Sequence, residues 1–187
     1  MTLTATKAIE GTYGADPIHS VFGFSVVHNG ISTYRGSLDD VSATLRADGD
    51  KLELEGAAKV ESISIREPEQ FRAHVLGEEF FNADEHPEVR FRSDSIELSE
   101  DGRVRVAGEL EIAGTTREVT ATGTYTAPIA DPLGDERFAF ELETKFDRRD
   151  FGFDWQMELP SGGNVLDWDV TLNVHLELVK AGDKEGE

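Results

Sequence analysis

Apolar and polar residues alternate with a period of two along most of this chain. The segments 51–61, 103–112 and 166–178 place apolar or small residues at every second position, with mostly charged or polar residues between them. Because successive side chains of an extended chain point to opposite faces, this period predicts β-strands with one buried face and one face in water. Turn signals such as Asp48-Gly49 and Asp101-Gly102 separate these segments. The chain is therefore expected to be mainly β.

One region departs from this period and reads as a short helix, near 67–82. Pro68 fits a first helical turn, and Phe71 and Val75 are spaced so that they share one face of a helix. Gly77 can interrupt or cap this helix. We expect one short helix here, with room for a second.

The number and spacing of the predicted strands indicate an antiparallel sandwich or a closed barrel. A barrel is favoured, because closure removes the exposed sheet edges and about eight strands enclose space for one small ligand. No repeat or low-complexity linker divides the sequence, so we expect one domain over 1–187. Its core should span about 11–180, with loose ends at 1–10 and 181–187.

The charge and the residue types exclude several classes of function. The formal net charge is −20, from 38 acidic and 18 basic residues, so the chain repels phosphate backbones and is not expected to bind nucleic acid. The absence of cysteine excludes disulfides, thiolate metal sites, iron–sulfur clusters and cysteine nucleophiles.

The sequence also lacks the patterns of export and membrane anchoring. Its first residues have no basic stretch followed by an apolar run, and no segment approaches the roughly 20 apolar residues of a membrane span. We expect a cytoplasmic protein without stable membrane insertion.

The segment 19–28, HSVFGFSVVH, has two faces that differ in kind. Phe22, Phe24, Val26 and His28 share one face of an extended strand, while the residues between them are mostly smaller. The bulky face can pack into an ordinary core, surround a metal ion or line a container for an apolar ligand.

Several segments, taken in order, resemble the successive motifs of one known family. They are DPIHSVFGFSVVH at 16–28, YRGSLDDVSATL at 34–45, HVLGEEFFNADEHPEVRFRSDSI at 74–96, VAGELEIAGTTREVT at 106–120 and RRDFGF at 148–153. The chain is thereby similar to the YceI-like family of polyisoprenoid-binding proteins. The resemblance implies an extended, lipocalin-like, antiparallel eight-stranded β-barrel with a helical insertion. It also implies an apolar lumen that holds a long isoprenoid chain, such as a quinone tail or a polyprenyl lipid.

The same resemblance implies no catalytic residues and no cofactor other than the bound isoprenoid lipid. It also admits a homodimer. The strand phases then give a set of residues expected to face the lumen and touch the ligand: Phe22, Phe24, Val26, His28, Phe91, Leu110, Ile112, Phe138, Phe140, Phe151, Phe153, Trp168 and Val170. The alternative is that these residues simply fill a core, since any barrel shows apolar alternation.

The histidines allow different interpretations. His28 can stand at the polar end of the lumen and donate to a quinone carbonyl or a phosphate oxygen, or it can be a core histidine bonded to a backbone carbonyl. His19 lies near Asp16, but neighbouring strand residues point apart, so an Asp-His-Ser relay is not expected and a structural bond is. His74 belongs to the helical insertion and can cross the opening of the barrel. No His-x-His or helical pair is present, so no metal site is expected.

Two features near residue 150 also allow two interpretations. FGFDW at 151–155 is either a gate for the ligand or a strand whose aromatic residues pack into the core. Arg148 and Arg149 can meet an anionic head group, or they can be solvated or neutralised by Asp147 and Asp150.

The chain departs from the family pattern in the helix. Phe71-Arg72 stands where the family has an Arg-Asp pair, so the helix must be fastened to the barrel in another way.

These observations favour a non-enzymatic binding protein that shields an isoprenoid chain from water for storage or transfer. One alternative is an enzyme that acts on a hydrophobic small molecule through His28 and a neighbouring carboxylate. Another is a dimeric interaction module without a ligand, for which an exposed apolar row on one outer strand would be the sign.

Overall fold

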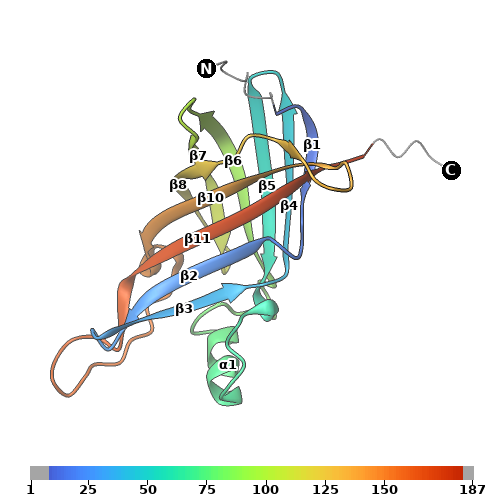
Figure 1. Ribbon diagram of the computed structural model, residues 1–187. Helices are drawn as coiled ribbons and strands as arrows, with labels where there is room; N and C mark the ends of the chain where they lie inside the picture. Colours follow the sequence, from blue (N-terminus) through green and yellow to red (C-terminus); the bar gives the residue numbers. More distant parts are fainter. Residues whose placement is uncertain (1–8, 183–187) are drawn as a thin grey trace.

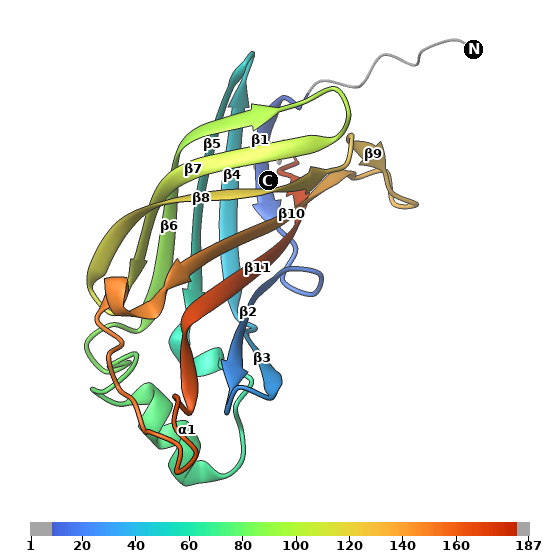
Figure 2. The same ribbon diagram turned by 90° about the vertical axis from the view of Figure 1, so that its left-hand side faces the viewer.

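The computed structural model describes residues 9–182 and shows a closed antiparallel barrel with one short α-helix (Figures 1 and 2). Eight strands form the closed cycle, because β11 pairs with both β1 and β10. The predicted fold is confirmed. In the order in which they pair around the barrel, the strands are β1 (Gly11–Ala15), β4 (Val41–Asp48), β5 (Lys51–Lys59), β6 (Glu88–Leu98), β7 (Arg103–Ile112), β8 (Thr115–Tyr125), β10 (Glu136–Asp147) and β11 (Leu166–Lys180).

The long strand β11 pairs with two different strands along the same edge. Its C-terminal residues pair with β1, and its earlier residues pair with β2 (Val21–His28), which in turn pairs with β3 (Ser32–Leu38). The β2–β3 hairpin therefore lengthens the wall of the barrel beyond β1 (Figure 1). A two-residue strand, β9 (Ile129–Ala130), pairs with the start of β10.

The helix α1 (Glu69–Leu76) lies inside the predicted range 67–82 and at one end of the barrel (Figure 1). Pro68 is its N-cap, and Gly77 caps its C-terminus by donating its N–H to the carbonyl of His74. Two short 3₁₀ turns were not predicted: η1 (Val60–Ser62) and η2 (Arg148–Phe151). Within the described residues, no helix is long and apolar enough to cross a membrane.

Arg72 fastens α1 to the chain that leaves the barrel. Its Nη1 donates to the carbonyls of Ile63 and Ile65 at 3.1 and 3.2 Å, and its Nη2 donates to the carbonyl of Glu61 at 2.6 Å. A planar guanidinium can serve several carbonyls at once because it carries five N–H donors. Phe71-Arg72 replaces the Arg-Asp pair of the family, and these hydrogen bonds of Arg72 hold the helix in its place.

The opposite end of the barrel is filled by its own side chains. This packed end consists of fully or almost fully buried residues from four strands: Tyr13, Leu45, Phe138, Phe140 and Leu178. The ring centroids of Tyr13 and Phe138 lie 4.9 Å apart, and those of Phe138 and Phe140 lie 5.3 Å apart, both edge to face. Such contacts leave no space for a ligand at this end.

Arg137 on β10 ties three acidic residues together outside the packed end. Its Nη1 donates to Asp16 and to Glu177 at 2.8 Å each, and its Nε donates to Asp131 at 2.8 Å. The hydrogen bond from Arg137 holds the pKa of Asp16 well below its usual range. The connection between β1 and β2 is thereby anchored to β10 and β11.

The predicted loose ends, 1–10 and 181–187, lie largely outside the described residues. Of the part that is described, Ile9 is buried against the core and the N–H of Ala181 donates to the carbonyl of Thr12 at 2.8 Å.

Replacing Arg72 should loosen α1. The variant Arg72→Met keeps much of the side-chain volume but removes three hydrogen bonds from a charged donor, so we expect a loss of about 2 kcal/mol in the free energy of unfolding. Urea denaturation measures this loss, and hydrogen exchange should show α1 opening first. The control is Arg66→Met, since Arg66 is exposed and its side chain makes no hydrogen bond within the described part of the chain. Equal effects of the two substitutions would contradict the fastening role.

Acid should weaken the fold partly through Arg137 and Asp16. Because the folded pKa of Asp16 is depressed, its contribution to stability is present above the unfolded pKa of about 3.9 and is lost as the pH falls towards the folded value. Arg137→Gln removes the largest cause of this depressed pKa and so reduces the contribution, while the backbone N–H groups of Ile18 and His19 still donate to Asp16. We therefore expect the free energy of unfolding to fall less steeply between about pH 5 and pH 2 than in the wild type. Arg46→Gln, which breaks an exposed pair with Glu55, is the control and should keep the wild-type slope.

Candidate ligand-binding site

A cavity of about 460 Å³ lies between the packed end and α1. Its walls are mostly aromatic and aliphatic. They come from β2, β3 and β11, with single residues of β6, β7 and β10, and from α1 and the segment after it, η2 and the loop that follows η2. The residues predicted to face a lumen that do line this cavity are Phe22, Phe24, Val26, His28, Ile112, Phe153 and Val170. The strand phase inferred for 19–28 therefore agrees with the structure. Volumes of this order are typical of sites for small organic ligands.

Phe24 reaches the cavity wall because the strand beside it carries a glycine. Gly36 pairs with Phe24, and a Cβ at Gly36 would stand only 2.6 Å from the Phe24 ring. The Phe24 ring therefore lies across Gly36. Its centroid is 6.2 Å from the centroid of the Tyr34 ring. Any larger residue at position 36 would displace Phe24.

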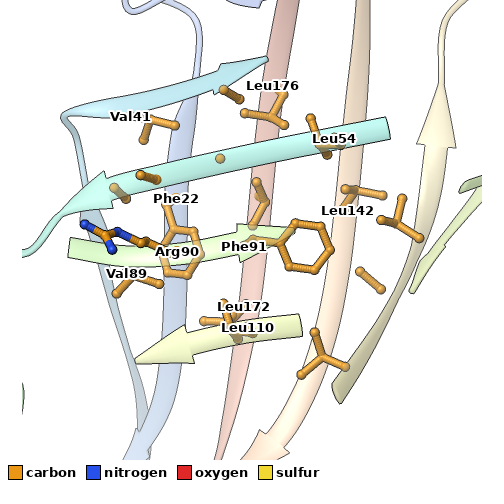
Figure 3. Close-up of a pocket in the computed structure, with 18 of the residues that line it drawn as sticks. Phe22, Val41, Leu54, Val89, Arg90, Phe91, Leu110, Leu142, Leu172 and Leu176 are labelled. Carbon is orange, nitrogen blue, oxygen red and sulfur yellow. The ribbon is translucent and has the colours of Figure 1, made fainter. Parts of the chain in front are cut away.

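A second, smaller cavity of about 80 Å³ lies deeper in the barrel (Figure 3). Phe91 and Leu110, also predicted to face the lumen, line this space. Phe22, Val89 and Leu172 line both cavities and so separate them. The bore is thus hollow in its α1 half, narrow in the middle and filled at the packed end.

Four predicted lumen residues line neither cavity: Phe138, Phe140, Phe151 and Trp168. Phe138 and Phe140 belong to the packed end. Phe151 is buried, and its ring centroid lies 4.7 Å from that of Phe146. Trp168 lies beside Arg148 and Arg149, whose guanidinium carbons are 4.3 and 4.6 Å from the centre of its ring.

The segment 151–155 is not a strand. Residues Arg148–Phe151 form η2, and the chain then runs as a loop past Trp155. This loop changes the facing of its aromatic residues, so the period of two does not apply to Phe151 and Phe153.

An aromatic cluster lies at the α1 end of the cavity. The sequence pointed to part of it, since 151–155 was one candidate for a gate and His74 was expected near the opening. The ring centroids of Phe80 and Trp155 lie 5.6 Å apart, and those of Phe81 and Phe153 lie 5.2 Å apart. The ring centroid of His74 lies 5.2 Å from that of Phe80 and 5.2 Å from that of Trp155, and its Nε2 hydrogen-bonds to Glu79. His74 thus lies at the opening, as expected. Phe80 and Phe81 lie within the range 67–82 that was predicted to be helical, and only their apolar character pointed to them.

The two adjacent arginines have different environments. Arg149 is half-exposed and pairs with Asp147, which lowers the pKa of that carboxyl to about 2. Arg148 is only 3% exposed and lines the large cavity. Its Nε donates to the carbonyl of Asp167 at 3.0 Å and its Nη1 to the carbonyl of Phe153 at 2.6 Å. Burial lowers the pKa of Arg148.

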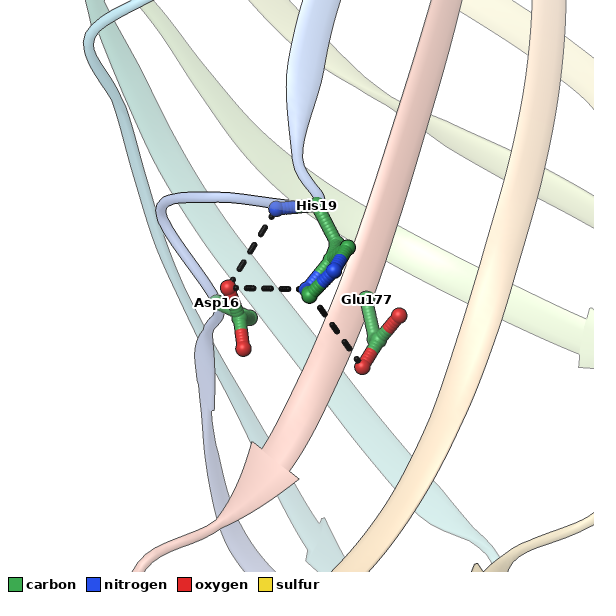
Figure 4. Close-up of side chains that lie close together, drawn as sticks. All are labelled: Asp16, His19 and Glu177. Atoms are coloured by element: carbon green, nitrogen blue, oxygen red, sulfur yellow. Dashed lines mark hydrogen bonds and ion pairs between the residues drawn. The ribbon is translucent and has the colours of Figure 1, made fainter.

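A polar cluster of Asp16, His19 and Glu177 lies on the connection between β1 and β2 and on β11, apart from the cavity (Figure 4). One ligand-type atom from each lies within 4.8 Å of the others, as in a metal site. However, Arg137 already donates to both carboxylates. His19 Nδ1 lies 3.2 Å from Asp16, so the expected structural bond is present and the cluster is held by protein charges.

The chain is similar in sequence and in structure to known proteins. A UPF0312 protein of Pseudomonas putida is 27% identical over 183 residues, covering 95% of this chain and 91% of that protein. The crystal structure of BcnA from Burkholderia cenocepacia matches with a TM-score of 0.72 at 19% identity, over 87% of this chain and 98% of BcnA.

A third similar protein is a polyisoprenoid binding domain from Saccharophagus degradans that is implicated in plant cell wall breakdown. It matches with a TM-score of 0.64 at 11% identity, over 92% of this chain and 100% of that domain. These structural likenesses establish a shared barrel fold. The sequence model of the YceI-like domain matches residues 13–178, most of the chain, and the chain therefore belongs to the YceI-like domain family.

Proposed function

We propose that this protein binds an isoprenoid lipid, an isoprenoid quinone or a polyprenyl lipid, and shields its chain from water for storage or transport. The observation that carries this proposal is the apolar cavity of about 460 Å³ inside the barrel. The polyisoprenoid binding by a domain of the same fold supports the choice of ligand class. Burial of apolar surface contributes roughly 25 cal/mol per Å², so a hydrocarbon chain can bind here without polar contacts.

The difference between the two ends of the bore suggests the direction in which a lipid chain would enter. The packed end is closed, and the aromatic cluster around Trp155 lies at the α1 end, so the chain should enter past α1 with its tail towards Phe22. A tail longer than the large cavity must displace Phe22 or Leu172 to reach the smaller one. Side chains at such a constriction can change rotamer far more easily than the hydrogen-bonded strands can separate.

The two alternative functions have less support. An enzyme built on His28 needs a carboxylate beside the ring, and within residues 9–182 no acidic group lies within ion-pair distance of His28. A dimeric module needs an apolar row on one outer strand. The large exposed apolar residues of the described chain instead lie on turns, loops, α1 and the short strand β9: Ile18, Ile31, Phe71, Ile129, Leu133 and Met157.

Native mass spectrometry tests the proposal directly. Protein purified from its own cells should carry an added mass, and organic extraction should release an isoprenoid lipid of that mass. Repeated finding of unliganded protein, together with no uptake of added farnesol or menaquinone, would count decisively against the function.

Filling the cavity should prevent uptake. Val26 lines the cavity and its neighbour Val27 does not, so Val26→Trp and Val27→Trp form a matched pair on one strand. We expect Val26→Trp to weaken farnesol binding at least about tenfold, by occupying the space of the ligand, and Val27→Trp to bind within about threefold of the wild type. Circular dichroism and thermal melts verify that both variants fold.

A charge in the cavity wall should have the same effect for a different reason. Phe24→Asp places an unpaired carboxylate against the hydrocarbon chain, which disfavours both the charge and the ligand. We expect loss of farnesol binding by isothermal titration calorimetry, whereas Ser25→Asp, at a position that does not line the cavity, should bind normally. Normal binding by a folded Phe24→Asp would show that Phe24 does not touch the ligand.

A further inference from the structure

Arg148 has a hydrogen-bonding group that the protein leaves unused. Its Nε and Nη1 donate to backbone carbonyls, but its Nη2 is enclosed and has no hydrogen-bond partner among residues 9–182. Buried polar groups are almost always paired, and a buried donor without an acceptor costs free energy. The fold therefore keeps Nη2 unpaired at a cost to its own stability.

The charge of Arg148 has no direct ion-pair partner among the described residues, and the carboxylates of Asp147, Asp154 and Asp167 act on it only from a longer distance. No carboxylate of the described residues lies within 4 Å of its guanidinium nitrogens, and Asp147, its neighbour in sequence, is bound by Arg149 through Nε at 2.9 Å. The Trp168 ring, 4.3 Å from the guanidinium carbon, offers a cation–π contact but no counter-ion. A buried cation of this kind is stabilised when an anion binds beside it.

The position of Arg148 places this unused charge at the polar end of the large cavity. Arg148 and His28 both line the cavity. His28 pairs with Leu166 in the sheet, and the next residue, Asp167, accepts the hydrogen bond from Arg148 Nε. Both polar side chains are therefore held at the same stretch of β11. The other end of the cavity, at Phe22 and Leu172, is apolar.

We propose that the cavity binds an amphiphile with an anionic head group, a phosphate or a carboxylate, which accepts a hydrogen bond from Nη2 of Arg148 while the chain points towards Phe22. This inference rests on the proposed lipid-binding function and adds the class of head group and its orientation. Because Nη2 is enclosed, the head group reaches it by displacing a cavity side chain. Arg148 is the counter-ion of the head group, and His28 is the second donor.

The test compares two probes that share one chain, farnesyl phosphate and farnesol. The wild-type protein should bind farnesyl phosphate about tenfold more tightly or better, as expected for a charge-assisted hydrogen bond in a buried site. In Arg148→Gln the ratio of the two affinities should fall to within about threefold of one. Arg149→Gln removes the adjacent, half-exposed charge and should keep the preference. Inorganic phosphate alone should bind much more weakly than farnesyl phosphate.

Each outcome separates the two proposals. Binding of both probes with equal affinity by the wild type overturns the anionic head group and leaves lipid binding intact, whereas binding of neither refutes the proposed function itself. An unchanged preference in folded Arg148→Gln, or inorganic phosphate binding as tightly as farnesyl phosphate, also overturns the proposal. If Arg148→Gln does not fold, nitrogen-15 NMR of the wild type decides. The Arg148 side-chain resonances should shift with farnesyl phosphate and much less with farnesol, and equal shifts would contradict the proposal.

Discussion

The antiparallel pairing of β10 with β11 is the contact on which the rest of the structure depends. It runs without interruption from Arg137 opposite Val179 to Asp147 opposite Asp169 and closes the sheet into a barrel. Closure places the inner faces of strands that are distant in sequence around one bore. It also brings η2, which follows β10, against the start of β11, and so creates the environment of Arg148. Without this seam the apolar faces would belong to an open sheet with exposed edges.

The division of the bore into a packed half and a hollow half follows from the partners of β11. Where β11 pairs with β1, Tyr13 and the phenylalanines of β10 meet across a short distance and fill the interior. Where β11 pairs with β2, the hairpin lengthens the wall, and α1 covers the end instead of another strand. The cavity lies there, and Phe80 and Trp155, whose ring centroids are 5.6 Å apart, line it on the α1 side. One strand thus supports two kinds of interior.

Charge is distributed according to the same division. The many acidic residues lie mainly on the surface, where Arg137 and other basic residues pair with some of them. The wall of the hollow half is mostly apolar, and its basic or titratable side chains are Arg148, His28, His74 and Tyr34. If the cavity takes an anionic head group, as proposed above, the negative surface opposes its entry, and the hydrophobic burial of its chain has to offset that repulsion. This physical selectivity would keep small free anions out.

The sequence alone determined the features that depend on local period and on near neighbours. Alternation predicted strands such as β7, the break in that alternation predicted the helix within 67–82, and the facing of Phe22, Phe24 and Val26 agrees with the cavity. The number of predicted strands and the need to cover sheet edges favoured a closed barrel, and the resemblance to the YceI-like family implied the same fold.

Only the tertiary structure decided which aromatic residues surround space and which fill it. Phe138 and Phe140 have the same alternating pattern as Phe22 and Phe24, and the difference arises from the residues that face them across the barrel. Likewise, Arg148 and Arg149 are adjacent residues of the same type, and the 3₁₀ turn buries Arg148 and leaves Arg149 half-exposed. Packing across a barrel joins residues more than a hundred positions apart, such as Tyr13 and Phe138, and no local pattern records how well such partners fit.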